Sequence, residues 1–157
     1  MLRRRAGAEA GESLIEVLVA VVILGLSGVA VMAGLGLAVK VSDIHRKETT
    51  SGAYVRSYAE AIENYVATPG SDNYKPCATA NAYNVSAVVS ALGLPSGYTA
   101  THDPAKSVGN NGIAALGCTV DTGVQQVTLS VTSSDARAVE TLVIVLRRPC
   151  DPSVAAC

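Results

Sequence analysis

Two carboxylates stand at the start of a long apolar run near the beginning of this chain. Glu12 and Glu16 are four residues apart, and no charged residue occurs from Val17 to Val39. On an α-helix, this spacing places both carboxylates on one face. An ionised carboxylate at the centre of a bilayer costs up to about 3 kcal/mol, so a carboxylate inside a membrane span is a functional candidate. Glu16 is therefore a candidate functional residue if this run lies in lipid.

The apolar run is long enough to cross a membrane. As a helix, the segment from Val17 to Val39 would extend roughly 35 Å, against a hydrocarbon core of about 30 Å. Arg3, Arg4 and Arg5 precede it, and basic residues beside a span tend to stay in the cytoplasm. We expect a single-pass protein of the cytoplasmic membrane whose C-terminal part lies outside.

A cleaved secretory signal peptide is the alternative for this segment. Cleavage in the region Gly36-Leu37-Ala38, where small residues flank a leucine, would start the mature chain at Val39. The run is longer than the roughly 7 to 15 apolar residues of a secretory signal, and acidic residues separate it from the arginines. Both features favour a helix that is retained.

An amphipathic pattern continues beyond Lys40, with apolar residues at three- and four-residue steps and charges on the other face. No proline occurs from Met1 to Val66, and Pro69-Gly70 supplies a stop signal. We expect one helix of about 55 residues from near Glu12 to Val66, longer than usual in a globular domain. Its second half would use an apolar stripe to cover a head domain, and the stripe comprises Val41, Ile44, Val55, Tyr58, Ala59, Ile62, Tyr65 and Val66.

The remainder of the chain predicts a small α+β head. Asn84 is placed to cap a short helix, and Gly93 is placed to end it. Alternation and β-branched residues then indicate an antiparallel sheet of about four strands, covered by the amphipathic half of the long helix. The predicted elements are a helix at 85–92 and strands at 98–102, 113–120, 127–132 and 139–146.

Signals for catalysis or ion binding are weak. His45 and His102 are far apart, and we expect both on the surface, one on the polar helix face and one at a strand end. A calcium site at Asp103 and Asp121 lacks the spacing of a calcium loop. The net charge is −1, and arginines cluster only at the N-terminus. The sequence therefore predicts no basic surface of the kind that binds nucleic acid. We expect a protein that is not an enzyme and binds no cofactor, metal or nucleic acid.

The four cysteines all follow the apolar run, on the side where disulfides persist. Free thiols are the alternative. Four cysteines allow three pairings, among which sequence does not choose. We favour Cys77 with Cys118, joining the loop after the long helix to the sheet, and Cys150 with Cys157, closing a C-terminal loop.

The segment before the apolar run resembles a known processing motif. Gly11 is followed by Ser13, Leu14, Ile15 and Glu16, behind a short basic leader and ahead of a hydrophobic helix. This arrangement is similar to that of type IV pilins and of the pseudopilins of type II secretion and competence systems. In that family a glycine precedes the cut and a glutamate stands fifth in the mature chain.

The resemblance implies a role as a structural subunit of a pilus or secretion-type filament. A prepilin peptidase would cut after Gly11, and the new N-terminus at Glu12 would be N-methylated. The resemblance divides the chain into a leader at 1–11, a transmembrane half-helix at 12–39 and a pilin-like head at 40–157, which includes helical residues 40–66. Implied partners are other pilin-like subunits, the peptidase, a platform protein, an assembly ATPase and membrane lipid.

One residue departs from the family pattern. The first mature residue is usually phenylalanine or methionine, whereas here it is Glu12. Its carboxylate would compete with Glu16 for the new α-amino group, which puts the methylation and the strength of the pairing between subunits in doubt. The departure fits a minor subunit better than an abundant one. A signal-anchored binding or enzymatic domain that never assembles is the alternative from another class.

Overall fold

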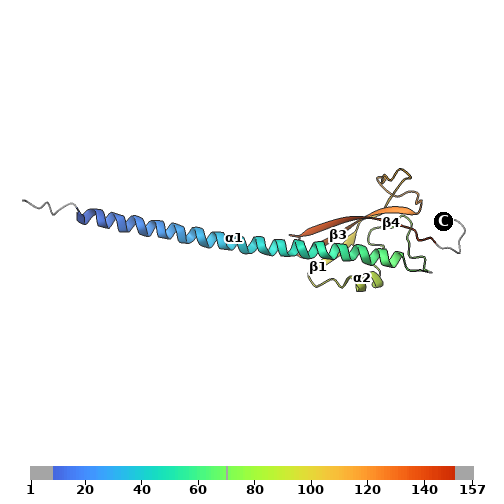
Figure 1. Cartoon of the computed structure of the whole chain (residues 1–157), viewed down its shortest axis with the longest axis horizontal. Helices are drawn as coiled ribbons and strands as arrows, with labels where there is room; N and C mark the ends of the chain where they lie inside the picture. The colour runs from blue at the N-terminus through green and yellow to red at the C-terminus, as the bar shows by residue number, and fades with distance from the viewer. Residues whose placement is uncertain (1–8, 70, 151–157) are drawn as a thin grey trace, which may run out of the picture. The chain divides into compact units, whose positions relative to one another are not determined.

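The computed structural model describes residues 9–69 and 71–150 of the 157-residue chain (Figure 1). It confirms the predicted α+β class, a long N-terminal helix with an open antiparallel sheet of four strands. The chain divides into two units between Asp43 and Ile44, and each is described by itself. The elements are α1 (Glu9–Val66), α2 (Ser86–Leu92), β1 (Tyr98–His102), β2 (Lys106–Ser107), β3 (Val124–Ser133) and β4 (Val139–Arg147).

Helix α1 ends at the predicted residue but begins earlier than predicted. It has 58 residues and starts at Glu9 rather than near Glu12, so it includes three residues of the expected leader. Its C-terminal end at Val66 precedes Pro69, whose ring disfavours helical geometry in the residue before it.

Strand β3 is the centre of the sheet. It pairs with β4 along one edge, from Val124 opposite Arg147 to Thr132 opposite Val139, without a skipped residue. Along its other edge it pairs with β1 and then with the two-residue strand β2. All pairs are antiparallel, and burial alternates strictly along β3, so one face of the sheet is buried and the other is accessible.

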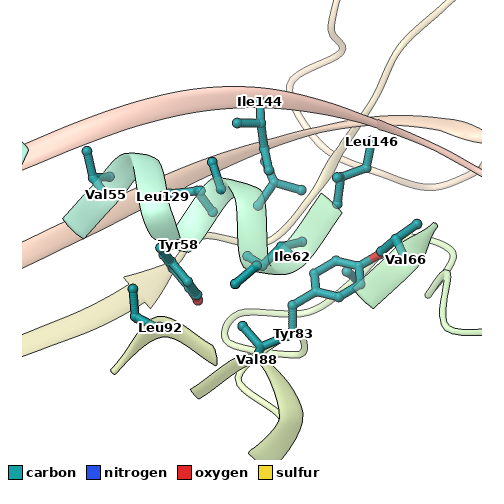
Figure 2. Packing of buried hydrophobic residues seen from close by; sticks show 14 of the residues in the cluster. Val55, Tyr58, Ile62, Val66, Tyr83, Val88, Leu92, Leu129, Ile144 and Leu146 are labelled. Atoms are coloured by element: carbon teal, nitrogen blue, oxygen red, sulfur yellow. The ribbon is translucent and has the colours of Figure 1, made fainter. Parts of the chain in front are cut away.

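The buried face of the sheet packs on the C-terminal part of α1. Ile62 is fully buried, and Figure 2 shows it between Ile144 of β4 and Val88 of α2. The predicted helix stripe forms much of this core, whereas Val41 is exposed. The helical and strand residues of the core are Val55, Tyr58, Ala59, Ala61, Ile62, Val66, Val88, Leu92, Val127, Leu129, Val131, Ile144 and Leu146.

The short helix follows the prediction except at its N-terminus. Val85 occupies the cap position without a side-chain hydrogen bond, so the expected Asn84 cap is wrong. Asn84 instead accepts a hydrogen bond from the Tyr58 hydroxyl and donates one to the carbonyl of Ala100, at 3.1 Å. Gly93 ends the helix with φ +54°, a left-handed conformation that glycine adopts at little cost.

The predicted strand at 113–120 is wrong. These residues form a loop whose only assigned pairing is the isolated bridge between Val108 and Ala114. The β-branched and apolar residues suggested a strand, but no face of this loop is buried: Ile113, Leu116 and Val120 are 67%, 104% and 70% exposed. Strand β2 was not predicted, because a two-residue strand carries no periodic signal.

Ser51 is a buried hydroxyl on the inner face of α1. It is fully buried, and its Oγ has no hydrogen-bond partner in the described part of the chain. We expect Ser51→Ala to raise the free energy of unfolding by about 1 kcal/mol, because an unpaired buried polar group is removed and alanine favours the helix. Urea unfolding followed through the tyrosine signal measures this, since all six tyrosines lie from Tyr54 to Tyr98.

Ser57 on the exposed face of α1 provides the matched control. Ser57→Ala gains the helix propensity alone, about 0.5 kcal/mol. A smaller gain for Ser51→Ala than for Ser57→Ala would show that the buried hydroxyl is satisfied in solution.

Candidate functional site

The first unit presents an apolar surface without a protein partner among the described residues. Its 18-residue window of highest hydropathy averages 2.7, and none of that window is buried. From Leu14 to Val39, the exposed fractions of the large apolar side chains range from 51% at Val19 to 79% at Met32. By length and composition this part of α1 could cross a membrane.

The candidate processing and assembly residues all lie on α1. Gly11, Glu12 and Glu16 fall within the helix, but the side chains before Leu14 are outside the described residues. The Glu16 side chain is exposed and makes no hydrogen bond or ion pair with a described residue. The four-residue spacing places Glu12 and Glu16 one helical turn apart, as expected from sequence.

The predicted bridge between Cys77 and Cys118 is present, with Cα atoms 5.2 Å apart. It joins the loop after α1 to the loop before β3, across 41 residues of sequence. Closing a loop of this length stabilises a fold by roughly 3–4 kcal/mol through the entropy of the unfolded chain. Cys150 is also disulfide-bonded, whereas its expected partner Cys157 lies outside the described residues.

No protein-family model, curated protein or solved structure matches this chain. A functional assignment therefore depends on its own residues and their geometry.

Asp121 links the loop after α1 to the start of β3. Its carboxylate accepts hydrogen bonds from the Tyr74 hydroxyl at 3.0 Å, the Cys77 backbone N–H at 2.9 Å and the Gly123 backbone N–H at 2.6 Å. Burial and then the Asp121 contact raise the pKa of Tyr74 well above its usual value. The Arg148 guanidinium lies 5.2 Å from the centroid of the Tyr74 ring, so Arg148 also lies beside this tyrosine.

Cys77, Cys118 and Asp121 also form a group with metal-ligand spacing. The two sulfur atoms are bonded to each other, so neither offers the thiolate that a metal ion requires. The Asp121 carboxylate already accepts three donors. This group therefore acts as a structural clamp between two loops.

A polar network missed by sequence reasoning surrounds Gln125. This fully buried side chain accepts a hydrogen bond from the Ala78 N–H and donates to the Lys75 carbonyl and the Tyr83 hydroxyl. The alternation along β3 could have placed Gln125 inward, two residues before the buried Val127. Its hydrogen bonds satisfy backbone groups of the long loop that crosses this end of the sheet.

The two histidines differ in environment. His45 is exposed as predicted and lies 3.1 Å from Glu48. His102 is only 3% exposed, so the expectation of a surface residue is wrong. Its Nε2 accepts a hydrogen bond from the Tyr83 backbone N–H, and its Nδ1 lies 2.8 Å from the Asp103 carbonyl. These partners require a neutral ring with the proton on Nδ1.

Burial lowers the pKa of His102 below its ordinary value of 6.5, although the Asp103 carbonyl partly opposes the shift and Lys75 adds to it. The unfolded chain therefore binds more protons than the folded chain just below pH 6.5. We expect stability to be complete above pH 6.5 and to fall by up to about 1.4 kcal/mol per pH unit as the pH drops towards the folded pKa. Urea unfolding at a series of pH values measures the slope.

His102→Gln is the control for this slope, because it removes the titration and retains a polar side chain. The slope between about pH 6.5 and pH 5 should flatten in this variant, and an unchanged slope would assign it to another group. Lys47 and Ser133 lower the pKa of Asp135, so stabilisation by that carboxylate is lost only below its usual pKa of 3.8, outside this window.

Proposed function

We propose that this chain is the precursor of a pilin-like subunit, more specifically a minor pilin or pseudopilin of a type IV pilus or type II secretion-like filament. A prepilin peptidase would remove residues 1–11, and α1 would anchor the mature chain in the cytoplasmic membrane with its head outside. The subunit would then move into a cell-surface or periplasmic filament. Its role is structural rather than enzymatic.

The observation that carries the proposal is the position of Glu16. It is the last charged residue before a stretch of α1 that has no charge from Val17 to Val39 and exposes apolar side chains along its length. In a membrane anchor that never assembles, an acid at the start of the apolar stretch would destabilise the inserted helix and gain no compensating interaction. In a filament, it could pair with the new α-amino group at Glu12 of a neighbouring subunit.

The architecture of the head supports the same proposal. The C-terminal part of α1 covers one face of the antiparallel sheet, so one helix provides both the apolar segment and part of the head core. The disulfide between Cys77 and Cys118 suits a head that lies outside the cytoplasm. Partners would be other pilin-like subunits, the platform protein, the assembly ATPase and lipid.

Determination of the mature N-terminus tests the proposal directly. The chain is expressed with and without a prepilin peptidase, and the purified product is sequenced from its N-terminus and weighed by intact mass spectrometry. We expect a chain that starts at Glu12 with the peptidase and at Met1 without it. A start at Met1 in both cases, or at Val39, would support the signal-anchored domain that never assembles. The mass also shows whether Glu12 carries a methyl group.

A further inference from the structure

The two edges of the sheet differ in how their backbone groups are satisfied. In an antiparallel pair, alternate residues bond the neighbouring strand and the others point away from it. On β1 and β2 most of the outward groups are bonded within the chain, and the exceptions among the described residues are the N–H and C=O of Tyr98 and the N–H of Ala100. Asn81 bonds both the N–H and the carbonyl of His102, Asn84 bonds the carbonyl of Ala100, and Ser107 bonds Gly117 and Ala115.

The opposite edge, along β4, is open. The Arg148 N–H bonds Gly123, and the Ser133 N–H bonds the carbonyl of Ala138. This fixes the even-numbered residues of β4 as those that face β3. The N–H and C=O groups of the odd-numbered residues point outward, and no described residue bonds them: Val139, Thr141, Val143, Val145 and Arg147.

The open edge has only part of the usual protection of an edge strand. Protected edges carry charged side chains, above all lysine, or proline, an inward-pointing charge or a bulge. Strand β4 carries two charged residues, Glu140 at an inner-face position and Arg147 at its end, but it contains no proline or lysine, and its nine residues pair with β3 without a bulge. Three of its outer-face side chains are apolar and half-exposed: Val139, Val143 and Val145 at 53%, 52% and 51%.

A row of outward amides repeating every second residue is complemented by one kind of ligand, an extended backbone. We propose that the β4 edge (Figure 1) is a docking site for an extended segment of a different polypeptide, which adds to the sheet as a further strand. Its outer-face side chains would be uncharged and β-branched beside Val143 and Val145, with a carboxylate near Arg147.

A second copy of this chain fits the edge poorly if the proposed function holds. The β1 and β2 edges of a second copy are bonded from the carbonyl of Ala100 to Ser107, so its β4 edge offers the longest open row among the described residues. Antiparallel pairing of two β4 strands about a two-fold axis would run the two 44–66 helix segments in opposite directions. Subunits that enter one membrane in the same orientation do not meet in this way.

The test uses the full chain in detergent micelles and a fluorescent peptide with the β3 sequence, residues 124–133, which already complements β4. Binding is measured by fluorescence anisotropy, and amide hydrogen exchange is followed by NMR. Before the peptide is added, the outward amides of Thr141, Val143 and Val145 should exchange fast. The amides of Leu142 and Ile144, which face β3, should be protected.

Addition of the peptide should change the exchange of the outward amides alone. Thr141, Val143 and Val145 should become protected, while Leu142 and Ile144 stay as they were. Protection confined to the outward set would place the peptide on the β4 edge.

Two variants separate the edge from the outer face of the sheet. Val143→Pro removes an outward N–H without touching the ladder to β3, and we expect about tenfold weaker binding from the lost hydrogen bond and the proline ring. Thr128 lies opposite Val143 on β3, and Thr128→Lys places a charge on the same face away from the edge. This control should change the affinity by less than about twofold, because the backbone groups of the edge are intact.

A third measurement does not depend on the fold of any variant. The same peptide with methylated backbone nitrogens cannot donate hydrogen bonds and should not bind. The proposal is overturned if the unmodified peptide gives neither binding nor edge protection at about 1 mM, or if Thr128→Lys weakens binding as much as Val143→Pro. A concentration-dependent dimer that Val143→Pro abolishes would assign the edge to a second copy instead. If the mature chain kept its leader, the proposed function would be contradicted. The peptide-binding and hydrogen-exchange results would be interpreted as before, because they do not depend on cleavage.

Discussion

Glu16→Ala is expected to remove the subunit from filaments while leaving its insertion in the membrane intact. Removing one partner of a buried charge pair costs about 3–5 kcal/mol, because the other charge stays buried and unpaired. For Glu16 and a neighbouring α-amino group, this corresponds to roughly a hundredfold or greater loss in the assembly equilibrium. Insertion should not suffer, because the change makes the start of the apolar stretch more apolar.

The measurement compares the sheared filament fraction with the membrane fraction by immunoblot. Glu16→Gln keeps the size of the side chain and removes its charge, so it should behave as Glu16→Ala does. Glu12→Ala is the matched control one helical turn away, since it keeps the α-amino group and should still assemble. Normal incorporation of Glu16→Ala would refute the assembly role of this carboxylate.

Asp121→Ala is expected to cause the largest loss of stability in the head, about 3–5 kcal/mol. Its carboxylate satisfies the buried Tyr74 hydroxyl and two backbone N–H groups on two separate loops. Alanine would leave these donors without an acceptor, next to the disulfide that joins the same loops. Urea unfolding followed through the tyrosine signal measures the change.

Two controls accompany this prediction. Asp72→Ala removes a nearby exposed carboxylate and should change stability by less than about 0.5 kcal/mol. Asp121→Asn keeps an acceptor oxygen and should lose less than the alanine variant does. Equal losses for Asp121→Ala and Asp72→Ala would mean that water replaces the carboxylate in the variant.

Elements in which apolar residues recur at regular spacing were predictable from the sequence. The three- and four-residue steps from Val55 to Val66 indicated the buried helix face, and the alternation around Leu129 indicated the central strand. Pro69 marked the end of α1. The cysteine positions suggested the Cys77–Cys118 bridge, although the sequence offered two other pairings.

Features that depend on tertiary contacts were not predictable. Asn84 had the residue type and position of a helix cap, but its side chain bonds Ala100 and Tyr58 instead. His102 carried no local sign of burial, because its environment is built by Tyr83 from another segment. Gln125 was overlooked since a polar residue at an inward strand position is normally disfavoured, and here the long loop supplies its partners.

The direction of α1 across the sheet has a mechanical consequence for the head. Lys47 contacts Asp135 at the turn between β3 and β4, whereas Val66, at the end of the helix, lies on the Leu146 side of the core (Figure 2). The helix therefore runs along β4 in the same direction. A pull on the N-terminal end of this helix segment would load its side-chain contacts together in shear, which resists extraction better than peeling them apart in sequence.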